Sequence, residues 1–315
     1  MHAAVVEWDY FPIMRTPAQP VVDLRKQSPE WLLRGMVAAL ATLMTSAGFE
    51  AQQRRWIFQA GLQSDASSEQ AGQDLQDRWI DYQSRETDVP VRLHALWLAQ
   101  PSADAPVMLY LHGARWDLRG SAHRMQRLHE LGFAVLGIDY RGFGRSSPAL
   151  PSERTVCEDA CAAWRWLATQ LPQSPRYVYG HSLGGAIAVQ LAADADDVAG
   201  LIVEGTFTSI PDLFGTMRWG WRPLAALITE RFDSAQHVPH VRAPLLVVHG
   251  SQDELICPEL GRALFECATG PKRFLLVDGG SHHDTHAVGH AQLREAVREL
   301  FGLPTGLYDT TQQEV

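Results

Sequence analysis

Short apolar runs alternate with amphipathic stretches along most of the chain after residue 75. The runs have the length of buried strands and are rich in β-branched and aromatic residues. They comprise Val91–Leu98, Val107–Leu111, Ala134–Ile138, Tyr177–Tyr179, Leu201–Glu204, Leu245–Val248 and Phe274–Val277. Apolar residues at helical spacing separate several of these runs, at Ala122–Leu131, Val156–Gln170, Leu183–Ala193, Leu260–Ala268 and Ala291–Phe301. The alternation predicts an α/β fold with a mostly parallel central sheet and helices on both faces of that sheet.

Polar segments set the expected domain limits. Residues Ser64–Asp77 are rich in Ser, Gln and Asp, which is typical of an exposed linker. We therefore place a boundary near residue 75, between a helical N-terminal extension, residues 1–75, and an α/β domain, residues 76–303. The polar residues 304–315 are expected to form a frayed C-terminal tail.

The extension contains an apolar segment, Trp31–Ala47. Its charge-free part, Gly35–Ala47, is shorter than the roughly 20 residues that a membrane-spanning helix needs. We interpret the segment as a helix packed on the domain, which agrees with a cytoplasmic protein. The alternative is the apolar core of a signal peptide or a membrane anchor, and the protein would then be exported or membrane-associated through residues 31–47.

Composition excludes several classes of protein. The 315 residues are 46% apolar and 20% charged, which is ordinary for a globular protein. A formal charge of −9 argues against nucleic acid as a partner, because phosphate binding needs a basic face. The four cysteines form no C-x-x-C pair, so neither a zinc finger nor a disulfide scaffold is expected. The sequence makes no prediction of oligomeric state.

A G-x-S-x-G motif spans Gly180–Gly184, between the run Tyr177–Tyr179 and an alanine-rich helical stretch. A turn that exposes a nucleophilic serine between a strand and a helix is so tight that flanking side chains would clash, and glycine removes them. The serine hydroxyl would lie near the positive end of the following helix. We therefore predict Ser182 as the nucleophile; the alternative is a tight glycine turn with an incidental serine.

Two backbone N–H groups are candidates for an oxyanion hole. The negative charge that develops on an attacked carbonyl oxygen needs donors already aimed at it. One is expected from Leu183, directly after the nucleophile, and the other from Ala114, in the His-Gly-Ala turn after the run Val107–Leu111. We expect His112 in that turn to be a structural hydrogen-bonding residue.

A serine nucleophile needs a base, and the base needs a carboxylate that orients it. The expected chain order is serine, acid, histidine. Asp253 follows the run Leu245–Val248 in the stretch HGSQDE, and Glu204 ends the preceding run. We favour Asp253 as the acid, with Glu204 as the second candidate and a turn-forming aspartate as the alternative for Asp253.

The loop after the last run carries the candidate base. It reads DGGSHHDTH and offers His282, His283 and His286, with His290 beyond them. Because two glycines precede it, we favour His282, with His283 as the second choice. The same histidines together with Asp284 are an alternative site for zinc or another transition metal, although no H-E-x-x-H motif is present.

The ordered series of motifs resembles the α/β-hydrolase superfamily, over about residues 78–302. It is most similar to the serine-hydrolase branch that contains the relatives of the Bem46 protein. The stretches that carry the resemblance are LYLHGA, GIDYRGFGRSS, YGHSLGGAIA, VEGTFTSI, LLVVHGSQDELI and GGSHHDT. The family triad matches Ser182, Asp253 and His282. The oxyanion turn is bulkier than the family form, because Arg115 and Trp116 follow Ala114.

The resemblance implies cleavage of a small-molecule carboxylic ester or thioester through an acyl-enzyme intermediate, in the manner of a carboxylesterase or lipase. No metal or organic cofactor is expected. The alternatives are acyl transfer with the same triad, and a peptidase or amidase. A short lid is expected at about residues 207–239, where Met217, Trp219, Trp221, Leu224 and Ile228 either line an acyl pocket or pack the lid on the core.

Overall fold

The computed structural model describes residues 47–60, 75–216 and 227–303. Contacts between residues divide the chain into two units, Met1–Gly48 and Phe49–Val315, and the second unit contains the sheet. The boundary predicted from the sequence lies near residue 75 instead. Most of the apolar segment 31–47, the centre of the predicted lid and the tail 304–315 lie outside the described residues. No helix in the described part of the chain is long and apolar enough to cross a membrane.

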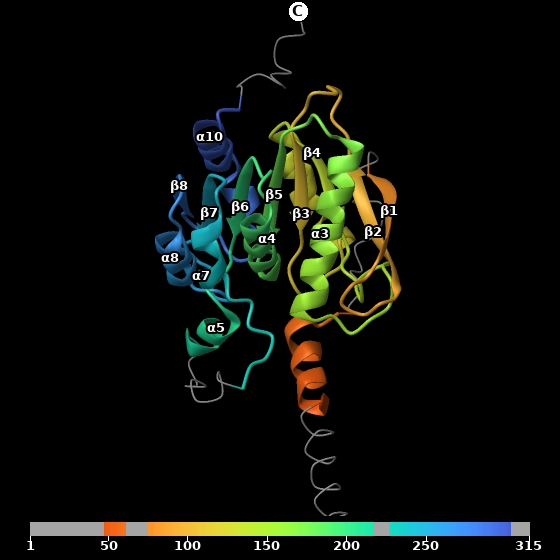
Figure 1. The fold of residues 1–315 in the computed structure, drawn as a ribbon. Coiled ribbons are helices and arrows are strands. Elements are labelled where there is room, and N and C mark those ends of the chain that lie inside the picture. Colours follow the sequence, from red (N-terminus) through yellow and green to blue (C-terminus); the bar gives the residue numbers. More distant parts are fainter. Residues whose placement is uncertain (1–46, 61–74, 217–226, 304–315) are drawn as a thin grey trace, which may run out of the picture. The chain divides into compact units, whose positions relative to one another are not determined.

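The described strands form one eight-stranded sheet in the order β1-β2-β4-β3-β5-β6-β7-β8 (Figure 1). β1 pairs antiparallel with β2 and β2 with β4, and every other pairing is parallel. The mostly parallel α/β architecture is therefore confirmed. The strands are β1 Gln76–Gln83, β2 Pro90–Leu98, β3 Val107–Leu111, β4 Ala134–Ile138, β5 Arg176–His181, β6 Gly200–Glu204, β7 Leu245–Gly250 and β8 Lys272–Val277.

Helices cover both faces of the sheet, since strand residues alternate between two apolar clusters. On one face, Leu109 and Val178 pack with side chains of α3, α4 and α8. On the other, Tyr110 and Tyr179 pack with side chains of α2 and α10. The longer helices are α2 Ala122–Glu130, α3 Glu153–Gln170, α4 Leu183–Asp194, α8 Pro258–Cys267 and α10 His290–Phe301.

Short helices follow several strands at the carboxyl edge of the sheet. They are η2 Arg119–Ser121, α5 Ile210–Thr216, α7 Ser234–His237 and α9 Thr285–Val288, whereas η3 Val238–His240 leads into β7. Residues 47–58 are also helical. Loops at this edge of a parallel sheet are where ligand sites are expected.

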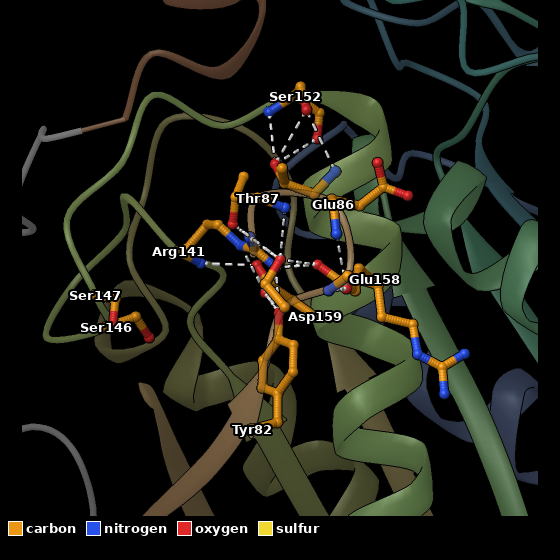
Figure 2. A network of polar contacts seen from close by, with 12 residues as sticks. Tyr82, Glu86, Thr87, Arg141, Ser146, Ser147, Ser152, Glu158 and Asp159 are labelled. Carbon is orange, nitrogen blue, oxygen red and sulfur yellow. Dashed lines mark hydrogen bonds and ion pairs between the residues drawn. The ribbon is translucent and has the colours of Figure 1, made fainter. Parts of the chain in front are cut away.

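A buried polar network joins the antiparallel edge of the sheet to its parallel part (Figure 2). The Arg141 Nε group donates to Asp159 of α3 over 2.9 Å, and its guanidinium pairs with Glu158 at 2.7 Å. Tyr82 of β1 donates to the same Asp159 carboxylate. Arg141, in the turn after β4, and Tyr82 of β1 thus share the same partner on α3, so the network connects β1 to that helix.

Candidate active site

Ser182 lies at the junction of β5 and α4, with φ 55° and ψ −123°. This conformation is strained for a residue with a side chain, and such strain is typical of functional sites. Hydrogen bonds on both sides hold it: the Ser182 amide donates to the carbonyl of Glu204, and the Thr206 hydroxyl donates to the Ser182 carbonyl, each over 2.9 Å. The side chain is half-buried. The turn is therefore fixed by backbone contacts between two neighbouring strands.

The glycines around Ser182 are required by the tight packing of this turn. A Cβ added at Gly180 would lie 2.2 Å from the carbonyl oxygen of Gly184, and one added at Gly184 would lie 2.2 Å from that of Leu111. Real Cβ atoms do not approach a backbone oxygen so closely, so each glycine excludes a clash. The turn has the geometry that the motif predicted.

His282, in the loop between β8 and α9, contacts Asp253, in the loop after β7. Its Nδ1 lies 2.8 Å from Asp253 Oδ2. The other carboxylate oxygen accepts the backbone N–H groups of Leu255, at 3.0 Å, and Ile256, at 2.8 Å. Burial raises the pKa of Asp253, but hydrogen bonds from His249 and His282 outweigh that effect and hold the pKa below its usual range. The carboxylate is thus charged and fixed beside the imidazole.

The second candidate acid, Glu204, has other partners. Its carboxylate lies 3.4 Å from the buried guanidinium of Arg124 and accepts the hydroxyl of Tyr179. Arg124 also donates to the carbonyls of His282, over 3.2 Å, and His283, over 3.0 Å. Sequence reasoning missed Arg124, because a single arginine in an amphipathic helix gives no sign of its distant partners. Arg124 thus connects Glu204 to the backbone of the loop that carries His282 and His283.

The four histidines of this region have different surroundings. His282 is buried against Asp253, whereas His283 is exposed. His286 is buried 3.8 Å from Glu204, and burial together with Arg124 lowers its pKa to about 2. His290 lies near a surface carboxylate, Glu130, at 3.4 Å. Within the described ranges, no three His, Cys, Asp or Glu side chains converge closely enough to hold a metal ion.

The predicted oxyanion turn passes directly beside Ser182. A Cβ added at Gly113 would lie 3.0 Å from the Cβ of Ser182. Ala114 follows, and Leu183 opens α4, where the first N–H groups have no partner within the helix. His112 is fully buried, and its Nδ1 lies 2.7 Å from the Gly113 carbonyl oxygen. The fold therefore brings both predicted donor residues to Ser182.

Ser182, His282, Ala114 and Leu183 all line one cavity of about 540 Å³. This volume is in the range of small-molecule sites. The wall is largely apolar, and its larger apolar side chains come from four separate segments of the chain. The apolar side chains that contribute are Trp56, Ile57, Trp116, Phe207, Ile210, Leu213, Phe214, Leu255 and Ile256.

Matches of this sequence to known families and proteins include the following three. A family model described as serine aminopeptidase, S33, matches residues 102–235. An uncharacterized protein of Mycobacterium tuberculosis (strain CDC 1551 / Oshkosh) is 33% identical over 273 residues, which cover 84% of this chain and 93% of that protein. The lysophosphatidylserine lipase ABHD12 of Danio rerio is 33% identical over 186 residues, 53% of this chain and 48% of that protein.

Solved structures with the same fold include two esterases. Est1E from Butyrivibrio proteoclasticus, with ferulic acid bound, matches with a TM-score of 0.57 at 20% identity, over 68% of this chain and 97% of that chain. The Pyrococcus furiosus esterase Pf2001 matches with a TM-score of 0.60 at 18% identity, over 76% and 95%. At these identities the likeness establishes the fold alone.

Proposed function

Since this chain belongs to the α/β-hydrolase superfamily, we propose that it is a serine hydrolase that cleaves a carboxylic ester or thioester through an acyl-enzyme intermediate. The observation that carries the proposal is the 2.8 Å contact between His282 Nδ1 and Asp253 Oδ2, in a pair whose imidazole shares a cavity with Ser182. A serine on a strained turn, a histidine and a charged carboxylate are the three parts of such a catalyst.

In the first half of the reaction, the Ser182 hydroxyl attacks the acyl carbonyl carbon and His282 Nε2 accepts its proton. Asp253 holds His282 in the tautomer with the proton on Nδ1 and stabilises the imidazolium that forms. The imidazolium then gives the proton to the departing alcohol or thiol. The acyl group remains on Ser182.

In the second half, His282 takes a proton from water, and the resulting hydroxide attacks the acyl-enzyme. The carboxylic acid leaves and Ser182 regains its proton. In both halves the carbonyl oxygen becomes negatively charged, and the backbone N–H groups of Leu183 and Ala114 are the donors assigned to it. Removal of one such donor typically costs about 10²–10³-fold in kcat.

The apolar wall of the cavity supports a medium or long acyl chain as the substrate's acid part. Each methylene moved from water to such a wall contributes about 0.8 kcal/mol. The relative from Danio rerio is named for a lysophosphatidylserine lipase activity, and two solved structures of this fold are esterases. These names support the ester class without fixing the natural alcohol.

A peptidase is the second candidate, because the matching family model is described as a serine aminopeptidase. The same three residues would attack an amide, and the leaving amine would accept the proton from His282. Hydrolysis of aminoacyl p-nitroanilides, measured beside p-nitrophenyl esters, separates the two candidates. We expect the esters to be the better substrates, because the wall is apolar.

The test of the proposal is hydrolysis of p-nitrophenyl esters from acetate to dodecanoate by the wild type and by Ser182→Ala. We expect turnover that is lost in the variant, together with labelling of the wild type, but not the variant, by a fluorophosphonate. The matched control is Ser251→Ala, which removes another partly buried loop serine that does not line the cavity. Equal activity of wild type and Ser182→Ala would refute the assignment of the nucleophile.

A further inference from the structure

Residues 54–59 form part of the active-site wall, although the sequence placed them outside the catalytic domain. Trp56, Ile57 and Gln59 line the cavity that contains Ser182. Phe58, between them, is 1% exposed and belongs to the main apolar core. The segment is therefore an integral part of the folded domain.

One set of contacts joins this segment to residues 230–232, in the C-terminal part of the predicted lid. Arg54 Nε lies 2.6 Å from a carboxylate oxygen of Glu230, which is buried. The Phe58 ring packs edge-on against Phe232, with a centroid distance of 5.9 Å. A half-buried ion pair on a fixed carboxylate and a buried aromatic contact leave the segment little freedom.

A second set of contacts ties the same segment to the oxyanion turn. The backbone N–H of Arg115 donates to the Phe58 carbonyl over 2.8 Å, and Arg115 Nε donates to the Gln59 side chain over 3.1 Å. Arg115 has φ 80°, an unusual conformation for a residue with a side chain. Because Arg115 directly follows Ala114, these bonds hold the segment at a fixed position relative to the predicted oxyanion turn.

Trp56 is the largest apolar side chain of this segment that lines the cavity. Its ring lies 4.8 Å from that of Phe214 in α5, so it spans between the N-terminal segment and the lid region. Trp56 is 50% exposed, and Ser182, which lines the same cavity, is half-buried. A large, fixed and half-exposed indole in a substrate cavity is suited to cover an apolar part of the ligand.

We propose that Trp56 is a specificity-determining residue that binds the distal methylenes of the substrate's acyl chain. The proposal rests on the proposed function and concerns chain-length selectivity rather than the chemical step. Short acyl groups are held at Ser182 and do not reach Trp56, whereas longer chains continue along the wall to the indole. The indole therefore raises the preference for long over short esters.

The size of the effect follows from the area that the chain covers. Each buried methylene is worth up to about four-fold in kcat/KM, by the transfer free energy of a CH₂ group. An indole that covers two methylenes thus accounts for up to about sixteen-fold. Because this contact is the same in the bound substrate and in the transition state, the loss appears in KM, with kcat little changed.

The experiment measures the ratio of kcat/KM for p-nitrophenyl octanoate to that for p-nitrophenyl acetate. In Trp56→Ala we expect this ratio to fall by about ten-fold, because octanoate hydrolysis loses far more than acetate hydrolysis. Trp56→Phe, which retains an aromatic ring, should recover most of the ratio. The matched control is Phe49→Ala, since Phe49 is also aromatic, also 50% exposed and on the same helix, but does not line the cavity.

A wild-type ratio in Trp56→Ala, or an equal loss on acetate and octanoate, would overturn the proposal while the hydrolase assignment stands. Equal ratios in Trp56→Ala and Phe49→Ala would overturn it as well. A wild type that hydrolyses no ester of the series and is not labelled by fluorophosphonate would instead overturn the proposed function, and the role of Trp56 with it. Thermal unfolding of each variant shows that the ratio reports on a folded protein.

Discussion

Replacement of Asp253 by asparagine tests the proposed catalytic pair most directly, because the new side chain has the same size. In the wild type, Oδ1 accepts backbone N–H groups from Leu255, at 3.0 Å, and Ile256, at 2.8 Å. The other oxygen lies 2.8 Å from His282 Nδ1. Asparagine has only one side-chain oxygen. If that oxygen keeps the two backbone donors, the amide NH₂ group must face His282.

The NH₂ group would then donate to Nδ1 and force the proton of His282 onto Nε2. In that tautomer Nε2 has no lone pair with which to accept the proton of Ser182, so the base is lost although its position is kept. Loss of the tautomer in a serine triad lowers kcat by about 10⁴-fold. This factor corresponds to about 5.5 kcal/mol of transition-state stabilisation.

The assay is kcat for p-nitrophenyl acetate and octanoate at neutral pH. Asp253→Asn should lower kcat on both esters by the same large factor, since the defect is in proton transfer. Glu254→Gln is the matched control, because it removes the neighbouring exposed carboxylate and should retain wild-type activity. If Asp253→Asn keeps kcat within ten-fold of the wild type, Asp253 is not the acid that orients His282.

Three further substitutions test the packing around the site. Gly184→Ala places a methyl group 2.2 Å from the Leu111 carbonyl oxygen, so we expect a loss of about 1–3 kcal/mol in the free energy of urea unfolding, together with a loss of activity. Arg124→Met leaves the carboxylate of Glu204 buried without its cation and should cost about 3–5 kcal/mol by the same measurement; a loss below 1 kcal/mol would contradict the pairing. His286 is kept neutral in the fold because burial and Arg124 lower its pKa to about 2, whereas in the unfolded chain it is protonated below about pH 6.5. The free energy of unfolding of the wild type therefore falls as the pH drops below 6.5. From pH 7 to pH 5, the free energy of unfolding of His286→Gln should rise by about 2 kcal/mol relative to that of the wild type. If the difference between the two proteins is the same at both pH values, the burial argument is refuted.

The parallel part of the fold was predictable because its strands are buried on both faces. Strands β3, β4 and β6 are buried at every position, so they read as continuous apolar runs. The edge strand β1 was missed, because its exposed positions carry polar residues that resemble the preceding linker. Its stability comes from pairing with β2 and from the contact between Tyr82 and Asp159, which no local pattern shows.

The candidate catalytic groups were predictable for a similar reason. Ser182, Asp253 and His282 each lie within five residues after the end of a strand, and in a parallel sheet such positions converge on one edge. The expected chain order does not distinguish Asp253 from Glu204, because both lie between Ser182 and His282 in the sequence. In the structure, the difference arises from contacts that the order does not contain, since Arg124 and Tyr179 engage Glu204 while Leu255 and Ile256 fix Asp253.

The residues of the cavity wall, unlike the proposed catalytic residues, cannot be recognised from motifs in the sequence. Trp56 and Phe214 meet at a centroid distance of 4.8 Å, yet 158 positions separate them in the chain and neither belongs to a motif. A cluster of three apolar residues at 56–58, inside a segment assigned to the extension, was the only local sign. The proposed catalytic residues thus lie beyond the ends of strands, where topology brings them together, whereas the wall that includes Trp56 is assembled from segments that topology alone does not place. For this reason Asp253→Asn and Trp56→Ala should act on separate parameters, the first on kcat for every ester and the second on KM for long ones.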